Sequence, residues 1–591
     1  MARRPQPDPA PAARAPAPRR RRLLWAITLL APLALAVAAE GLLRVTGVGK
    51  LEPLFVPVER SPGYLQPNPA AVHRFFPDPR RAPDVSIDTT WFPEEKAPDT
   101  LRIFVQGESS AAGFPYGRWA SPAALLQQRL QRSFPDRAVE VINTGMAAVT
   151  SYVLLDFADE IVAQRPDAVV IYTGHNEYLG IGGVGSSYAS AKSPALARFV
   201  ANLRRLHLYR ALERGLASLG AGPDAPGRAD GTLMSRVAAE RSIPLDSGLY
   251  EQGVEQFRSN LDRLLATYAG AGIPVFIGTL ASNERDQPPF ASGSDPVHSA
   301  RARYERARAL DATGDHAAAR AEYLAAKDAD ELRFRAPEAF NAVIREVAAK
   351  HGATVVDVQG ALAAHSRDGI VGSDLMLEHV HPNVEGYFRL ASAFYPAIVD
   401  WAGGPAVAVD DETARRELPV TEVDRLHGEY RVALLKNDWP FVPERRPTTL
   451  QAPANRIEEI AQSWFAGRSS WLEAMNDALA AYQQQGDYGE AARVAANLAD
   501  ALVDSGEAQY AAGVLMLRAE QAARGEHYLR RATALDGAKV EYRLSLAQAQ
   551  FMGGRVQESI ATLEAILAQH PGDARAEHWL AEMRKAAAAP R

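Results

Sequence analysis

The sequence predicts an α/β protein: a three-layer α/β/α domain with a five-stranded parallel sheet, joined to an all-α domain. Two patterns lead to this prediction. Between about residues 99 and 402, short apolar runs alternate with helical periods, as in parallel sheets covered by helices on both faces. Beyond residue 460 the pattern is almost wholly helical. A chain of 591 residues is long enough for two or three such domains.

The elements of the sheet domain follow from periodicity and composition. The predicted strands are Leu101–Val105, Ala138–Ile142, Ala168–Tyr172, Ile273–Gly278 and Thr354–Val358. The predicted helices are Pro122–Phe134, Tyr152–Gln164, Tyr250–Ala269, Ala339–Lys350 and Glu385–Trp401. Insertions at 180–248 and 300–331 interrupt this alternation, and the second reads as a helical hairpin.

Three candidate residues follow strand ends. Ser109, Gly145 and Asn176 each come just after a predicted strand, so they converge on the carboxyl edge of the sheet, where such folds bind ligands. His381 lies far along the chain, with Glu378 three residues before it. A serine hydroxyl becomes a good nucleophile when a base takes its proton and a third group orients that base. The chain supplies all three parts.

Each of these residues also has a purely structural explanation. Ser109 could cap a helix, Gly145 could serve a turn, and Asn176 could be a satisfied loop amide. His381 could be a packed loop histidine and Glu378 a solvated surface charge. The joint occurrence at strand ends favours the catalytic interpretation.

Metal and cofactor chemistry is not predicted. The chain has no cysteine, which excludes disulfides and thiolate ligands. His379 and His381 could suggest a metal pair, but in an extended segment their side chains point to opposite faces. The net charge of −6 argues against a nucleic-acid partner.

The N-terminal region predicts export. Residues 1–22 form a disordered basic tail that ends in Arg19–Arg22, and the apolar segment that follows, 23–44, reads as a transmembrane signal anchor. The arginines place the tail in the cytoplasm, so the catalytic domain would face the periplasm from the inner membrane. Cleavage after Ala36-Val37-Ala38 is the alternative.

The remaining regions are predicted from composition. Residues 45–98 are proline-rich and read as a tether and lead-in, and residues 403–460 read as a linker. Within 461–591, Gly-containing turns begin at Gly486, Gly525 and Gly554, with spacings of 39 and 29 residues around the 34 of tetratricopeptide repeats. This segment resembles such repeats, with a generic helical bundle as the alternative, and repeat surfaces usually bind a protein partner.

The motifs together resemble the four blocks of the SGNH/GDSL hydrolase superfamily. They are Gly107-Glu108-Ser109, Gly145, Gly174-His175-Asn176 and Glu378…His381, in this order over residues 99–402. The resemblance implies a flavodoxin-like fold. The family usually has aspartate where Glu108, Glu177 and Glu378 stand.

The resemblance also implies roles. Ser109 would be the nucleophile, His381 the general base and Glu378 the residue that orients it. The oxyanion hole would comprise the Ser109 N–H, the Gly145 N–H and the Asn176 amide. His175, Glu177 and Tyr178 would be possible pocket residues.

The expected function is a membrane-anchored serine esterase acting on O-acetyl or other O-acyl esters of cell-envelope glycans. One alternative is a glycan O-acetyltransferase with the same triad, favoured if Tyr116, Trp119 and Tyr178 line an aromatic cleft. The other is a non-catalytic repeat scaffold with a relic hydrolase domain.

Overall fold

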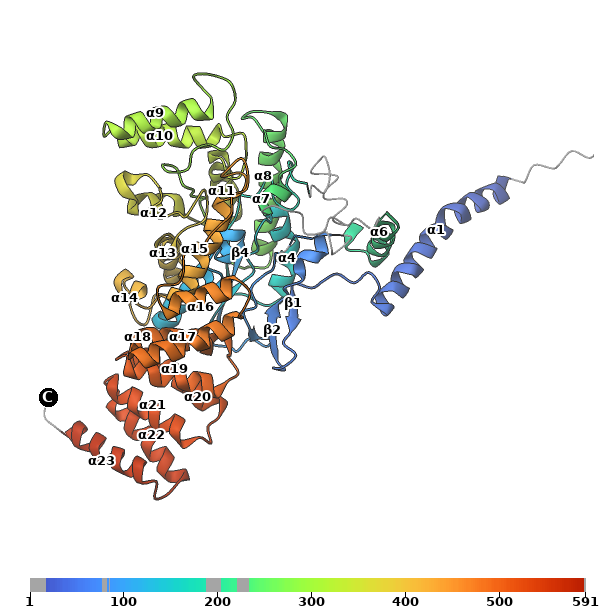
Figure 1. Ribbon diagram of the computed structural model, residues 1–591. Coiled ribbons are helices and arrows are strands. Elements are labelled where there is room, and N and C mark those ends of the chain that lie inside the picture. The colour runs from blue at the N-terminus through green and yellow to red at the C-terminus, as the bar shows by residue number, and fades with distance from the viewer. Residues whose placement is uncertain (1–17, 77–81, 84, 188–202, 221–232, 589–591) are drawn as a thin grey trace, which may run out of the picture.

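A five-stranded parallel sheet forms the centre of the protein. The computed structural model describes residues 18–76, 82–83, 85–187, 203–220 and 233–588 (Figure 1). In chain order the strands are β4 (Leu101–Gly107), β5 (Val139–Asn143), β6 (Ala168–Tyr172), β7 (Val275–Gly278) and β8 (Thr354–Val356). They lie in the order β5-β4-β6-β7-β8, and every pair is parallel. This is the flavodoxin-like order, so the predicted sheet is confirmed.

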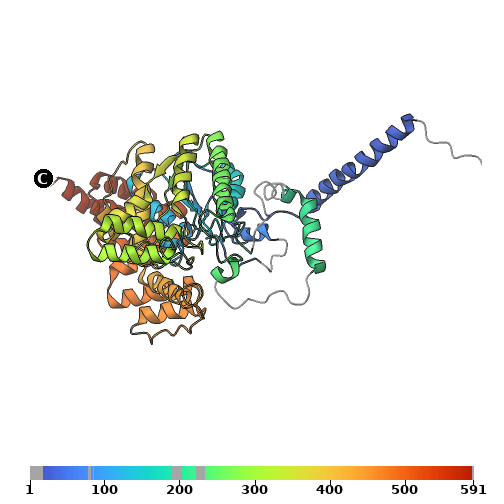
Figure 2. The same cartoon turned by 90° about the horizontal axis from the view of Figure 1, so that it is seen from above.

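Two groups of helices cover the sheet (Figures 1 and 2). One group is α4 (Ser151–Ala163), α8 (Gly248–Gly270) and α11 (Glu338–His351), with α8 contacting both others. The other is α3 (Pro122–Ser133), α12 (Val358–His365) and α13 (Val384–Trp401), with α13 contacting both others. Every residue of β4 and β6 is buried, as expected of strands covered on both faces.

The segment 45–98 folds against the sheet domain, which differs from the predicted tether. It forms a small antiparallel sheet of β1 (Phe55–Pro57), β2 (Tyr64–Pro67) and β3 (Phe92–Pro93), with a short 3-10 helix (Ala71–Phe75) between β2 and β3. The rings of Phe55 and Phe92 lie 5.5 and 5.8 Å from that of Phe104 in β4. The prolines at the ends of these strands interrupt the alternation of apolar and polar residues that predicts a strand, although edge strands tolerate proline.

The N-terminal helix α1 (Pro18–Thr46) exposes several large apolar side chains, including those of Leu33, Leu35 and Val37. Its Glu40 pairs with Arg44 and accepts the N–H groups of His207 and Leu208, the first residues of α6 (His207–Gly220).

The predicted membrane-spanning segment 23–44 is not confirmed. Within the residues that the structure describes, no helix is both long enough and apolar enough to cross a bilayer. The described end of this segment carries Glu40 and Arg44, and Glu40 is engaged by α6. The basic tail predicted for 1–22 falls largely outside the described residues, as do parts of the insertion 180–248.

The C-terminal region is a stack of helices (Figure 1). Each helix contacts the next along the chain, as in a repeat array whose units bury their apolar faces against neighbours. The helices are α16 (Arg456–Phe465), α17 (Trp471–Gln485), α18 (Tyr488–Ala501), α19 (Gly506–Arg518), α20 (Ala522–Leu535), α21 (Val540–Met552), α22 (Val556–Gln569) and α23 (Ala574–Ala588). The predicted all-α character is confirmed.

The segment 403–460 differs from the predicted linker because it contains α14 (Asp411–Arg416) and α15 (Glu422–Lys436). Thr421 and Asp424 form a capping box that starts α15, and the Asp424 carboxylate also accepts the indole N–H of Trp471 at 3.3 Å. Val423 is buried in the core of the repeat stack. Helix α15 is therefore the first layer of that stack.

The repeat stack rests on the sheet domain through aromatic side chains. Trp119 stacks on Trp471 with 5.6 Å between ring centroids, and the Arg118 guanidinium donates to the Asp500 carbonyl at 3.0 Å. A Cβ at Gly428 of α15 would lie 2.3 Å from Cδ1 of the buried Tyr116 ring, so only glycine fits there. Tyr116 and Trp119 thus pack at this contact and do not line a cleft.

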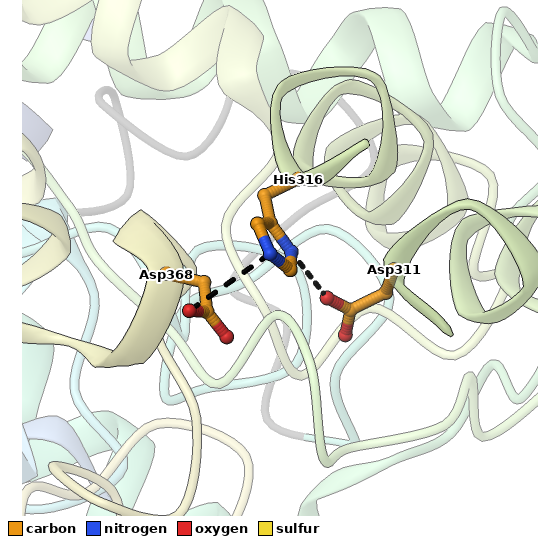
Figure 3. A group of neighbouring side chains, drawn as sticks. All are labelled: Asp311, His316 and Asp368. Carbon is orange, nitrogen blue, oxygen red and sulfur yellow. Dashed lines mark hydrogen bonds and ion pairs between the residues drawn. The ribbon is translucent and has the colours of Figure 1, made fainter. Parts of the chain in front are cut away.

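The insertion 300–331 contains the helical hairpin of α9 (Ala300–Ala312) and α10 (His316–Asp328). Asp311, His316 and Asp368 converge beneath it, with His316 Nδ1 2.9 Å from Asp311 (Figure 3). The buried guanidinium of Arg285 pairs with both carboxylates, at 2.9 and 3.0 Å. Asp311 belongs to the hairpin, whereas Arg285 and Asp368 lie outside it. These ion pairs therefore join the hairpin to the sheet domain.

Replacing Arg285 should loosen this hairpin. Arg285→Met leaves Asp311 and Asp368 without the guanidinium that they share, which costs about 2 kcal/mol, a value kept low because Asp368 is about one-third exposed and His316 still contacts both carboxylates. Amide hydrogen exchange in α9 and α10 should therefore speed up by about 30-fold. The control is Arg308→Met, since Arg308 is exposed and, among the residues that the structure describes, its ion pair is with Glu305. Equal protection in both variants would rule out this role for Arg285.

Candidate active site

Ser109 lies where β4 ends and the short helix α2 (Ser109–Ala112) begins. Glu108 precedes it in extended conformation, and Gly113, at φ 86°, ends the helix. This strand–turn–helix places Ser109 at the carboxyl edge of the sheet. Its Oγ is 2.7 Å from Nε2 of His381. The predicted nucleophile and base therefore lie within hydrogen-bond distance.

Glu378 orients His381. Both lie in a tight turn between Met376 and Pro382, which form an antiparallel bridge. The Glu378 carboxylate contacts His381 Nδ1 and accepts the backbone N–H groups of His379 and His381 at 2.7 and 2.9 Å. Its side chain has no exposed area. Glu378 is thus a buried member of a Ser–His–Glu arrangement and not a surface charge.

The expectation that His379 and His381 point to opposite faces is wrong. Both imidazoles contact the Glu378 carboxylate, and their ring centroids are 5.9 Å apart. The tight turn bends the segment away from extended geometry. His379 is enclosed by aromatic rings, and this burial keeps its pKa well below the usual value. The surrounding rings are those of Phe290, Phe334 and Phe441.

Glu108 fixes the loop that carries Asn176. Its buried carboxylate accepts the Thr173 hydroxyl at 2.9 Å and the N–H groups of Gly174 and Asn176 at 2.8 and 3.0 Å. Burial raises the pKa of Glu108 to about 8. The side chain of Asn176 is partly exposed, and none of its amide atoms bonds to another described residue. The amide can therefore donate to a substrate.

Gly145 lies directly against the start of α2, because a Cβ there would be 2.7 Å from the Ala112 nitrogen. Its N–H donates to the side-chain oxygen of Asn143 at 2.8 Å, and the Asn143 amide donates to the Ala111 carbonyl at 2.9 Å. The Gly145 N–H must share or lose its bond to Asn143 before it can donate to an oxyanion, so its role in the oxyanion hole stays a prediction. Asn143 is not among the residues predicted for the site, although a polar residue at the end of a buried strand is a signal that the sequence contains.

All three possible pocket residues are buried. Glu177 accepts the N–H and hydroxyl of Ser151 at 2.9 and 2.8 Å, which caps α4. The Tyr178 ring is buried and stacks on Phe340 with centroids 5.6 Å apart. His175 is also buried, and its Nδ1 accepts the Ala336 N–H at 3.3 Å. Burial lowers the pKa of His175 to about 3.

One wall of the site comes from outside the predicted hydrolase domain. The ring of Phe114 lies 4.5 Å from that of His381, and the guanidinium of Arg431 in α15 lies 4.8 Å from the Phe114 ring centre. The sequence does not single out Arg431, because the composition of residues 403–460 is typical of a linker. No short motif marks such a residue, since its place depends on how the repeat stack docks.

A parallel sheet with a Ser–His–Glu triad at its carboxyl edge defines an α/β serine hydrolase. Comparison with known families agrees. Residues 105–389 match the GDSL-like lipase/acylhydrolase family, and residues 510–574 match the tetratricopeptide repeat. The chain therefore carries a GDSL-like lipase/acylhydrolase domain followed by tetratricopeptide repeats, and the enzyme is a hydrolase of ester bonds.

Several solved structures are similar to the sheet domain. A catalytic mutant of an acetylxylan esterase from Geobacillus stearothermophilus has 15% identity, covers 54% of this chain and 100% of its own, and gives a TM-score of 0.28. A lipase/acylhydrolase from Enterococcus faecalis has 17% identity, covers 50% and 95%, and gives 0.26. A psychrotrophic esterase from Pseudoalteromonas sp. has 14% identity, covers 52% and 100%, and gives 0.25. No curated protein matches the chain.

Removing the Asn176 amide should slow catalysis without weakening the fold. Asn176→Ala is expected to lower kcat by about 100- to 1000-fold, the usual loss for one oxyanion donor. KM should change little, because the amide acts mainly on the tetrahedral intermediate. Steady-state kinetics on p-nitrophenyl acetate measure both. A loss below about fivefold would place the oxyanion elsewhere.

The pH profile of kcat/KM should show that His381 stays neutral, and active as a base, into the acidic range. Burial, with Arg431 as the second cause, lowers the pKa of His381 to about 3, while the contact with Glu378 acts in the opposite direction. A lowered pKa keeps the imidazole neutral, and able to accept a proton, at pH values where a free histidine is charged. The acid limb of kcat/KM should therefore lie below pH 6. A midpoint at or above 6.5 would contradict this.

Proposed function

We propose that this protein is a membrane-anchored serine esterase that acts through an acyl-enzyme on O-acyl esters, chiefly acetyl esters, of cell-envelope glycans. One observation carries the catalytic part: Ser109 Oγ lies 2.7 Å from His381 Nε2, and His381 Nδ1 contacts the buried Glu378. This is the arrangement that activates a serine for attack on a carbonyl.

The reaction takes two steps. In the first, His381 takes the proton of Ser109 as Oγ attacks the ester carbonyl, and then gives that proton to the leaving alcohol. In the second, His381 takes a proton from water, which attacks the acyl-serine. The bond between the acyl group and Ser109 Oγ then breaks, His381 returns the proton to Oγ, and the acid is released. Glu378 holds the imidazole with its proton on Nδ1 and stabilises the imidazolium. The Asn176 amide and the N–H of Ser109 bind the oxyanion in both steps.

The proposed location of the catalytic domain supports a cell-envelope glycan as the substrate. Arg19–Arg22 directly precede an apolar run in α1, an order that keeps the arginines in the cytoplasm and sends the domains after it to the periplasmic side of the inner membrane. The exposed apolar side chains of α1 would then contact lipid. An exported esterase held at the membrane meets cell-envelope glycans, and the repeat stack would bind a protein partner there.

The proposal is tested by incubating the full chain with p-nitrophenyl acetate and, separately, with O-acetylated envelope glycan. Release of p-nitrophenol and of acetate supports an esterase. Acetate transferred to an added glycan and not released to water would indicate the acetyltransferase. No reaction with either substrate, and no labelling by a serine-directed fluorophosphonate, would favour the non-catalytic scaffold. Fractionation of the expressing cells tests the anchor, which predicts recovery with the inner membrane.

A further inference from the structure

We infer that Arg431 selects esters whose alcohol part carries an anionic group, a carboxylate or a phosphate, next to the ester bond. This inference rests on the proposed esterase function and names a class of substrates for it. Arg431 lies in α15, outside the residues that match the hydrolase family. The selecting residue would thus be supplied by the C-terminal part of the chain.

Arg431 has no acidic partner among the residues that the structure describes. Its Nη1 donates to the Pro115 carbonyl at 2.9 Å, and its guanidinium lies over the ring of Phe114. The contrast within α15 is clear, because Arg425 pairs with both Glu422 and Glu429. A guanidinium has five N–H donors, so most of those on Arg431 remain available to a ligand.

The charge of Arg431 is partly removed from water. Its side chain is half-buried, and burial lowers its pKa. A charge in this position gains more from an ionic partner than an exposed one does, because fewer water molecules compete with the ligand. A carboxylate or phosphate would fit the planar guanidinium with two parallel hydrogen bonds.

Arg431 lies on the catalytic histidine's side of the site. The Phe114 ring contacts both groups: its centre lies 4.5 Å from the His381 ring centre and 4.8 Å from the Arg431 guanidinium. The Phe114 backbone is fixed by the Tyr387 hydroxyl, which donates to its carbonyl at 2.6 Å. The positive charge is close enough to contribute to the lowered pKa of His381.

This position indicates which part of the substrate carries the anion. His381 gives its proton to the leaving alcohol, so the alcohol must lie next to His381 in the productive complex. The acyl oxygen lies instead toward the loop that carries Asn176. A group that reaches past Phe114 to Arg431 therefore belongs to the alcohol. An acidic sugar that bears an O-acetyl group has this chemistry.

The test compares 4-acetoxybenzoate with its methyl ester, which removes the charge on the alcohol part. The two esters also differ in leaving-group reactivity, but this difference is the same for every variant and cancels when their ratios are compared. Arg431→Gln should lower the ratio of their kcat/KM values, carboxylate over methyl ester, by about 10- to 100-fold. Arg431→Lys should restore part of this ratio, because it keeps the charge without the planar fork. Arg425→Gln removes a charge from the same helix and should keep the wild-type ratio. Substituting 4-acetoxyphenyl phosphate shows which anion is preferred.

Equal ratios in the wild type and in Arg431→Gln would overturn the inference and leave Arg431 with only its packing on Phe114. A parallel loss on both esters would lead to the same conclusion. Failure of the esterase itself is distinguished by calorimetry on Ser109→Ala, with and without Arg431→Gln. There, 4-acetoxybenzoate should bind more tightly when Arg431 is present. Binding that does not depend on Arg431 would also overturn the inference.

Discussion

Full-length Ser109→Ala should lose p-nitrophenyl acetate turnover by about 1000-fold or more, while the neighbouring Ser110→Ala keeps most of it. Only Ser109 presents its hydroxyl to His381; the Ser110 hydroxyl is buried and donates to the Val380 carbonyl at 3.3 Å. The Ser109 change removes one oxygen from a partly exposed position, so the fold should be preserved.

Comparing the two variants separates the loss of the nucleophile from any effect on the fold. Both remove one hydroxyl from adjacent positions of the same short helix. A fluorophosphonate probe should label the wild type and Ser110→Ala but not Ser109→Ala. If Ser109→Ala keeps its activity, or if the probe still labels it, another nucleophile performs the reaction and the proposed mechanism is wrong.

The sheet and the triad could be predicted because their signals are local. A buried strand that ends in Gly107-Glu108-Ser109 fixes where the serine lies, and the parallel order brings later strand ends to the same edge. Glu378 and His381 are close in sequence, so a single turn brings them together. In each case a few neighbouring residues determine the geometry.

The rest of the site depends on contacts between distant segments. Phe114 could be seen as a neighbour of Ser109, but its contact with Arg431 results from the docking of α15. That docking needs Gly428 to accommodate Tyr116 and Trp471 to stack on Trp119. No periodicity reports such pairings. For the same reason, the local sequence of 45–98 and 403–460 predicts connecting segments and not the packed elements that the structure has.

The replacement of aspartate by glutamate at Glu108 also has a physical explanation. The longer side chain reaches across the end of β6 to three donors on the loop from Thr173 to Asn176. The positions of the donor groups, more than the side-chain length alone, determine whether such a change is tolerated. The sequence gives the side-chain length but not the positions of the donors.

Glu378→Gln should lower kcat by about 10,000-fold, close to the loss known for amide replacement of a triad carboxylate. The Glu378 carboxylate accepts from His381 Nδ1, which leaves Nε2 free to take the Ser109 proton. A glutamine can turn its NH₂ group toward Nδ1. The ring proton then moves to Nε2, which can no longer act as a base toward Ser109.

Glu378→Asp is the matched variant, because it keeps the charge and restores the residue that the family usually carries. It should retain far more activity than Glu378→Gln, with a loss set by how well the shorter side chain reaches Nδ1. Since Glu378 also accepts two backbone N–H groups, circular dichroism must first show that both variants fold. If folded Glu378→Gln stays within tenfold of the wild type, Glu378 only shapes the turn and His381 is oriented by another group.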